Sequence, residues 1–303
     1  MNDDLKKFKR NGYISFESGL NNSEISNLRK ILLKDIKDGD TSEFFIDYAL
    51  KNNEVYKTLF LKNIVKKLKK ISENVYYLSD LNIQINKINN SGRKKGWHID
   101  ANFEHYLKSD YLFSQDYRFY KVGIFLQDNS LTYGGGIDLK KGSHKSFKDF
   151  GKKTINFLYR SIINQIPIRK YRVPIKPGDV VIFDSRLAHA SSSSQVSTNK
   201  IKKNNMKIVL YWDVAGRLED AENYLNSIVV KSFVNKKLDN NIFNINFLSH
   251  HYPTSFNRFH KNFINESGIS FCSLDSDNSV YFKNIYKKKS SKFLDESSSF
   301  LKL

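Results

Sequence analysis

The sequence predicts a mainly β protein with flanking helices, built on a β-barrel or jelly roll. Helical periodicity dominates the chain up to residue 74, and a series of strand-like segments follows as far as residue 216. Glycine-containing turns separate these segments, without the regular alternation of strands and helices that a doubly wound parallel sheet requires. Together these observations favour a jelly roll with helices on one face.

The N-terminal part has two helical regions. Residues 5–38 predict two helices around ESGLNNSEISNLRKILLKDI, because Ser23 and Glu24 precede apolar residues at helical spacing. Residues 43–74 predict further helix with one buried stripe. The residues of that stripe are Val55, Leu59, Ile64, Val65 and Leu68.

The strand pattern begins at Val75. In YYLSDLNIQINKI, Leu81, Ile83 and Ile85 alternate with polar residues, as in a strand with one buried face. Further strands are predicted within residues 118–128, 132–144, 169–191 and 206–216, with turns at the glycines of TYGGG and at Pro177-Gly178.

Composition favours one domain. The chain has 303 residues, of which 40% are hydrophobic and 14% aromatic, enough for one large core. We expect a single domain over residues 1–303, with a core at about 8–215, a C-terminal extension of helices and loops at 216–286 and a flexible tail at 287–303. The single cysteine, Cys272, excludes a disulfide framework or a thiolate zinc cluster.

Charge and hydropathy limit the location and the partners. The N-terminus has no apolar run typical of a signal peptide, and no segment is apolar enough to span a membrane, so we expect a cytoplasmic protein. The formal net charge is +19, but the lysines are scattered along the chain, which argues against nucleic acid as a partner. Such charge would also favour an anionic small molecule. The oligomeric state stays open.

The stretch GWHIDANFEH, at residues 96–105, contains a candidate metal motif. His98 and Asp100 are two residues apart, so on an extended strand both side chains point to the same face. They would supply two thirds of the facial triad that binds non-haem Fe(II). The motif is short and occurs by chance, so the alternative is a strand end whose His and Asp face water.

His189 is the candidate for the third ligand. It follows GDVVIFDSRLA, whose apolar alternation predicts a strand that runs along the barrel wall to its mouth. The alternative is a partly buried histidine at a strand end. Because His98, Asp100 and His189 are all expected where strands stop, we interpret them as one metal site.

Four segments in order carry a resemblance to a known family. They are FKRNGYISFESGLNNSEISNLRKIL (8–32), GWHID (96–100), VGIFLQDNSLTYGGGIDLKKGSHKS (122–146) and KPGDVVIFDSRLAHAS (176–191). Over about residues 8–215 the chain resembles the phytanoyl-CoA dioxygenase-like family of Fe(II)/2-oxoglutarate-dependent oxygenases. Each motif is weak, but their order and spacing are specific. The resemblance implies a double-stranded β-helix, a cupin-like jelly roll.

The resemblance also implies an activity. His98, Asp100 and His189 would bind Fe(II), and 2-oxoglutarate would be the cosubstrate. The expected reaction is hydroxylation of a small molecule, with succinate and CO2 as co-products. Related halogenases have a small residue in place of the carboxylate, so Asp100 favours hydroxylation.

The chain departs from the family at the cosubstrate anchor. An arginine about eleven residues beyond the distal histidine is usual in the family, but no arginine occurs between Arg186 and Arg217. Lys207 is the candidate replacement, although it could be one more solvated lysine. Ser191 matches the family's H-x-S position, and Gln84 is a candidate polar contact on the strand before the metal loop.

Two other functions stay open. The first is a non-catalytic jelly-roll binding module without metal, and the second is an oxygenase that acts on nucleic acid. Among the remaining histidines, His144 is expected to be structural or to lie at the rim, and His250 and His251 could line a substrate lid. No motif identifies the substrate.

Overall fold

The structure is a computed structural model that describes residues 2–34, 36, 42–86, 97–100, 116–130, 134–148, 170–193, 206–225 and 258–272. The helices are α1 (Asp3–Asn11), α2 (Asn22–Lys34), α3 (Ile46–Lys51), α4 (Asn53–Thr58), α5 (Lys62–Ile71) and α9 (Arg258–Ser267). A 3-10 helix covers Ser143–Lys148, and a further helix covers residues 218–225.

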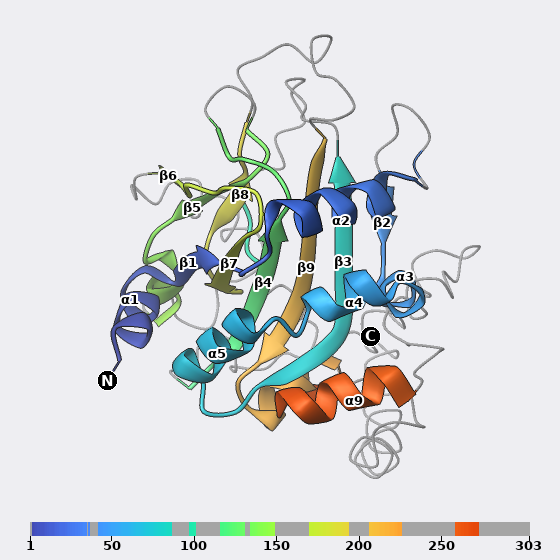
Figure 1. The fold of residues 1–303 in the computed structure, drawn as a ribbon. Coiled ribbons are helices and arrows are strands. Elements are labelled where there is room, and N and C mark those ends of the chain that lie inside the picture. Colours follow the sequence, from blue (N-terminus) through green and yellow to red (C-terminus); the bar gives the residue numbers. More distant parts are fainter. Residues whose placement is uncertain are drawn as a thin grey trace, which may run out of the picture.

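The strands are β1 (Tyr13–Glu17), β2 (Ser42–Phe44), β3 (Tyr76–Asn86), β4 (Phe119–Phe125), β5 (Ile137–Lys140), β6 (Lys170–Arg172), β7 (Asp179–Asp184), β8 (His189–Ser191), β9 (Lys207–Ala215) and β10 (Ser270–Cys272). A large sheet has the order β1-β7-β4-β9-β3-β10, with β2 also paired to β3, and a small sheet has the order β6-β5-β8. All these pairs are antiparallel except β10 with β3. The prediction of a mainly β protein with flanking helices is confirmed (Figure 1).

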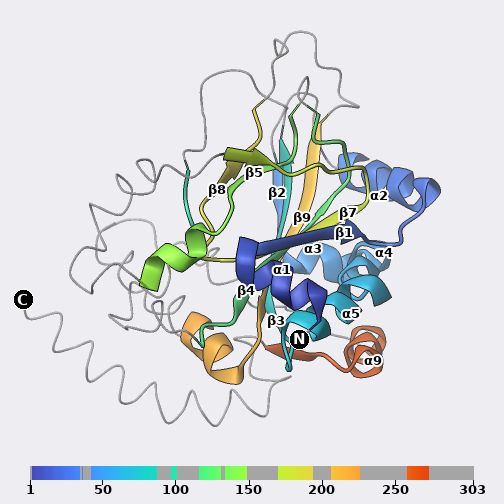
Figure 2. The same cartoon turned by 90° about the vertical axis from the view of Figure 1, so that its left-hand side faces the viewer.

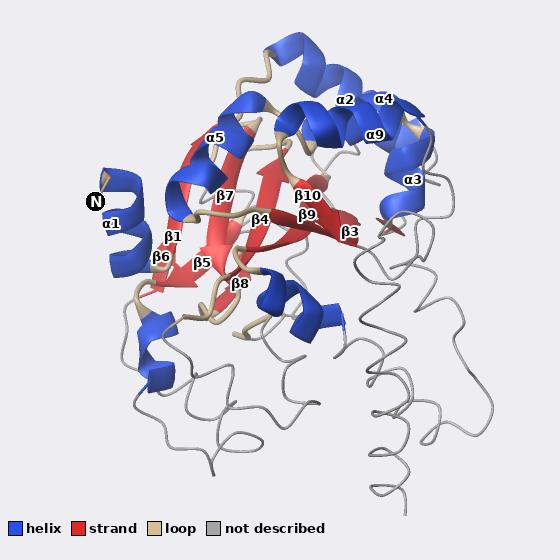
Figure 3. Ribbon diagram, turned by 90° about the horizontal axis from the view of Figure 1, so that it is seen from below, coloured by secondary structure: helices blue, strands red, loops and turns tan. Residues whose placement is uncertain are grey.

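Helices cover one face of the large sheet. Figure 3 shows α2, α3, α4, α5 and α9 on this side, with the small sheet on the other. The side chains that alternate toward the helices, such as Ile83 on β3, Val122 on β4 and Leu210 on β9, form one hydrophobic core with the helices. The predicted stripe of Val55, Leu59, Ile64, Val65 and Leu68 is buried in this core. Burial of these side chains stabilises the packing of the helices on the sheet, by roughly 1.5–3 kcal/mol for each large apolar side chain.

The opposite face of the large sheet, here called the inner face, turns toward the small sheet (Figure 2). Phe125 on β4, Phe183 on β7 and Val209 on β9 pack there against Ile137 and Leu139 of β5. Because neighbouring residues of a strand point to opposite faces, Lys121 on β4 and Lys207 on β9 share this inner face. The inner face therefore combines an apolar core with charged groups.

Gly123 makes room on the inner face for an aromatic ring. It pairs with Tyr211 across β4 and β9, and a Cβ atom at this position would lie 2.7 Å from Tyr211 Cε1. Gly123→Ala is therefore expected to lower the free energy of unfolding in urea by about 1–3 kcal/mol. Adding Tyr211→Leu should recover part of this loss, because leucine lacks the ring edge. An unchanged or higher free energy of unfolding for Gly123→Ala would contradict this packing, since alanine in a strand is otherwise preferred to glycine.

Most predicted elements occur, with four differences. Strand β2 (Ser42–Phe44) overlaps the start of the region 43–74, where helix was predicted. The region predicted as two helices contains strand β1 between α1 and α2. β10 lies in the C-terminal region, where only helices and loops were expected, and it pairs with β3. The strand expected to end near His189 stops earlier, at Asp184.

That early end has a local cause. Asp184 accepts hydrogen bonds from the backbone N–H and the guanidinium of Arg186, and its carbonyl accepts one from the backbone N–H of Leu187. These contacts close a tight turn that moves the chain from the large sheet to the small one. His189 therefore begins β8.

None of the helices among the described residues is long and apolar enough to cross a bilayer.

Candidate metal centre

A short backbone bridge places the two candidate histidine ligands side by side. His98 and His189 exchange both backbone hydrogen bonds, with N···O distances of 3.0 Å and 2.9 Å. Their rings are close as a result, with centroids 4.2 Å apart. The backbone N–H of Asp100 donates to the carbonyl of Ser185 at 2.9 Å. Backbone bonds alone thus bring the H-x-D segment to the turn that precedes His189.

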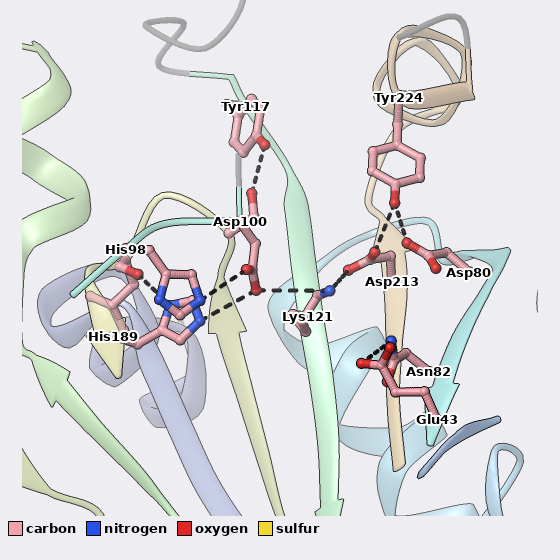
Figure 4. Close-up of polar contacts among 12 residues, drawn as sticks. Glu43, Asp80, Asn82, His98, Asp100, Tyr117, Lys121, His189, Asp213 and Tyr224 are labelled. Atoms are coloured by element: carbon pink, nitrogen blue, oxygen red, sulfur yellow. Dashed lines mark hydrogen bonds and ion pairs between the residues drawn. The ribbon is translucent and has the colours of Figure 1, made fainter. Parts of the chain in front are cut away.

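The three predicted ligands converge on one point. Asp100 Oδ1 is 3.7 Å from His98 Nε2, and Asp100 Oδ2 is 3.5 Å from His189 Nε2. One ligand atom from each of the three residues lies within 4.8 Å of the others (Figure 4). Ile99 between them is buried and points away, as expected for an extended segment.

His189 is held in a form that can bind metal. Its Nδ1 is 2.9 Å from the carbonyl oxygen of Leu187, an acceptor, so Nδ1 carries the hydrogen and Nε2 presents its lone pair. Burial lowers the pKa of His189 to about 4, which keeps the ring neutral near pH 7. Neutral imidazole is the form that ligates metals.

Asp100 stays charged despite its burial. Burial raises the pKa of this carboxyl, but the nearby positive charge, chiefly that of Lys121, outweighs this effect, so that the net pKa lies below the ordinary value. An ionised carboxylate next to two imidazoles is a donor set for Fe(II) or Zn(II). An ion about 2.0–2.2 Å from each donor needs the donors roughly 3–3.5 Å apart, close to the spacing of Asp100 from each histidine.

A chain of buried ionisable groups extends from Asp100. Lys121 Nζ is 3.8 Å from Asp100 Oδ2 and 3.3 Å from Asp213 Oδ1. The hydroxyl of Tyr224 donates toward Asp213 Oδ2 at 3.1 Å and also contacts Asp80 (Figure 4). None of these partners of Asp100 was predicted from the sequence. The sequence feature that could have pointed to them is Lys121, the one charged residue in the strand FYKVGIF.

Two of the predicted cosubstrate contacts lie next to each other. Lys207 is 6% exposed, and its Nζ is 3.4 Å from Ser191 Oγ. Lys207 belongs to the large sheet and Ser191 to the small one, so the lysine reaches across the space between the sheets. Gln84 lies on the inner face of β3, where it pairs with Val209 of β9. The next pair of these two strands on the same face is Asn86 with Lys207.

The remaining histidine candidates do not join this cluster. His144 is buried beside the turn at Gly12, where a Cβ atom would come within 2.5 Å of His144 Nδ1, so its structural interpretation fits better than a place at the rim. His250 and His251 lie outside the described residues.

Fold and site together define a mainly antiparallel β protein with a two-histidine, one-carboxylate centre of the kind that binds non-haem iron. The chain belongs to the phytanoyl-CoA dioxygenase family, whose family model matches residues 8–203. This confirms the resemblance found in the sequence.

Solved structures agree on the fold. The chain is similar to the non-heme alpha ketoglutarate dependent carbocyclase SnoK from nogalamycin biosynthesis, with a TM-score of 0.51, 14% identity and coverage of 71% of this chain and 83% of that chain. It is also similar to EctD from S. alaskensis with bound Fe, with a TM-score of 0.50, 18% identity and coverage of 71% and 76%. These likenesses support the jelly-roll fold. None of the curated proteins is a significant match to this sequence.

Proposed function

We propose that this protein is an Fe(II)/2-oxoglutarate-dependent oxygenase that hydroxylates a small molecule. The observation that carries the proposal is the convergence of one donor atom each from His98, Asp100 and His189 within 4.8 Å. Membership of the phytanoyl-CoA dioxygenase family supports it. Three protein donors on one side leave positions for other ligands, as in non-haem Fe(II) oxygenases.

The protein residues would bind, orient and exclude water. When bound, iron and 2-oxoglutarate supply the oxidation of a C–H bond by molecular oxygen, with succinate and CO2 as co-products. His98 and His189 would give neutral nitrogen donors, and Asp100 the one anionic donor. Phe183 packs against the His189 ring with centroids 4.9 Å apart, which limits water on that side of the centre.

Lys207 and Ser191 would hold the distal carboxylate of 2-oxoglutarate. The Lys207 ammonium would attract the carboxylate, and the neighbouring Ser191 hydroxyl would donate a hydrogen bond to it. Gln84, on the same inner face, would be a further polar contact. The placement of Lys207 on the inner face, which its role requires, supports this assignment.

This function is favoured over the two alternatives. A binding module without metal does not require three donors that converge on one point. It also does not require a neutral imidazole at His189 and an ionised carboxylate at Asp100, the forms that bind metal. An oxygenase for nucleic acid would need a concentrated basic and aromatic surface, and the sequence distributes its lysines widely. The expectation of an anionic substrate rests on the charge of +19 and stays a prediction.

Succinate formation tests the proposal. Purified protein supplied with Fe(II), oxygen and 2-oxoglutarate is expected to produce succinate, with no product when either Fe(II) or 2-oxoglutarate is omitted. Without oxygen, Fe(II) and 2-oxoglutarate together should give a weak visible absorption band. If saturating Fe(II) gives neither succinate nor the band, the binding-module alternative becomes the better explanation.

Product analysis tests hydroxylation separately. A similar fold is found in a protein described as a carbocyclase, so succinate formation alone does not define the reaction. Hydroxylation adds one oxygen atom from O2 to the substrate, whereas ring closure removes two hydrogen atoms. Mass spectrometry of the product formed under labelled O2 distinguishes them, and an unlabelled, dehydrogenated product would contradict hydroxylation.

A further inference from the structure

Lys121 occupies a position where an apolar residue would be expected. It lies in the middle of β4, on the inner face it shares with Gly123 and Phe125, and its side chain is 18% exposed. Its ammonium lies between two carboxylates, 3.8 Å from Asp100 Oδ2 and 3.3 Å from Asp213 Oδ1 (Figure 4). One of these carboxylates belongs to the metal centre and the other does not.

The ammonium is charged and held in place. Burial works against its charge, but the carboxyl groups of Asp213 at 3.3 Å and Asp100 at 3.8 Å favour the ammonium form. Rotation of Asp213 is limited, because its other oxygen lies 3.1 Å from the hydroxyl of Tyr224, which also contacts Asp80. Lys121 is thus a cation of fixed position beside Asp100.

Fold stability does not account for this arrangement. Buried ion pairs are often no more stabilising than apolar side chains of similar size, because removing charges from water is expensive. The other neighbours on the inner face, such as Phe125 and Val209, make an apolar core that would accept such a side chain. The lysine here places a cation next to Asp100, one of the three candidate ligands.

We propose that Lys121 is a positioning residue of the metal centre, which holds the Asp100 carboxylate toward His98 and His189 while Asp213 anchors the ammonium. The proposal rests on the metal centre proposed above. A protonated amine has no lone pair, so Lys121 is not itself a ligand. It limits rotation of the carboxylate by attracting Oδ2, the oxygen that is also 3.5 Å from His189 Nε2. Groups that orient a ligand in this way typically change metal affinity by about 10–100-fold.

Lys121 has two opposite effects on metal affinity, and the affinities of its variants show which one is larger. As a cation, Lys121 also repels a divalent metal, so its removal could strengthen binding if repulsion were the larger effect. The proposal requires the loss of orientation to be larger. Lys121→Met should then weaken metal binding, whereas Lys121→Arg, which keeps the charge, should retain most of the affinity.

Co(II) is a suitable probe, because its visible absorption reports the geometry around the metal. Titration calorimetry on the full chain is expected to give Co(II) binding about 10–100-fold weaker for Lys121→Met, together with a changed visible spectrum. Lys121→Arg should restore both the affinity and the spectrum. Lys67→Met is the matched control, because it breaks an ion pair with Asp4 of 2.8 Å that lies outside the site. It should leave both measurements unchanged.

A charge-balanced variant covers the case in which Lys121→Met fails to fold. Lys121→Met with Asp213→Asn removes the cation and its buried partner together, and it should show the same loss of Co(II) affinity. Wild-type or tighter binding by the folded variants would overturn the proposal. If His98→Ala, Asp100→Ala and His189→Ala also bind Co(II) like wild type, the metal centre itself is wrong. If they lose Co(II) and Lys121→Met does not, the positioning role alone fails.

Discussion

Replacing His189 with alanine is expected to abolish measurable Fe(II) binding, and the same holds for His98→Ala and Asp100→Ala. Each change removes one of three donors whose ligand atoms lie within 4.8 Å of one another. Fe(II) affinity should fall by more than the roughly 10–100-fold that is typical when only a residue that hydrogen-bonds to a metal ligand is removed. Calorimetric titration of the anaerobic protein with Fe(II) measures it.

The fold should survive these three changes. The bridge between His98 and His189 is made by backbone atoms, which alanine keeps. Circular dichroism should therefore be unchanged. His144→Ala is the control, because His144 is also a buried histidine but lies beside Gly12, outside the cluster. If all three ligand variants bind Fe(II) like wild type, the metal assignment is wrong.

Lys207→Met is expected to raise the 2-oxoglutarate concentration needed for half-maximal succinate formation by a few hundred-fold. Breaking a hydrogen-bonded ion pair in a buried site typically costs about 3–5 kcal/mol, which corresponds to this change in affinity. Fe(II) binding should be unchanged, because Lys207 is not one of the three ligands. The measurement is succinate formation against 2-oxoglutarate concentration, with Fe(II) affinity determined in parallel.

Ser191→Ala provides the comparison for Lys207→Met. Ser191 Oγ is 3.4 Å from Lys207 Nζ and would contribute only one hydrogen bond, worth about 0.5–1.5 kcal/mol. Its effect on the 2-oxoglutarate requirement should be correspondingly small. An unchanged requirement in Lys207→Met would mean that the anchor lies elsewhere. Lys200, Lys202 and Lys203, which lie outside the described residues, would then be the next candidates.

Much of the fold could be predicted because its signals are local. The alternation of Leu81, Ile83 and Ile85 with polar residues defines β3 and its buried face, and the stripe from Val55 to Leu68 defines the helical face that covers the sheet. The candidate ligands could be predicted for a related reason. Short motifs mark the segments that carry them, and the order of those segments limits how the chain can place them.

The ionisable groups behind the metal centre could not be predicted, because they come from different elements. Lys121, Asp213 and Tyr224 lie on β4, β9 and the helix at 218–225, and only the pairing of β4 with β9 brings them together. In the sequence, Lys121 is one of many lysines. The turn before His189 was missed for a similar reason, since Arg186 closes it through a side-chain contact that strand periodicity does not reveal.

The order of strands in the large sheet has a consequence for biosynthesis. Among the residues that the structure describes, β9 is the last long strand, yet it lies between β4 and β3 in the middle of the sheet. While the ribosome is still making the chain, β4 and β3 therefore have no partner between them until residue 215 has been made. The pairing of β1 with β7 also joins distant parts of the sequence. Such long-range pairing slows folding and leaves the edges of β3 and β4 exposed until β9 has been made, so the nascent chain is open to aggregation during that interval.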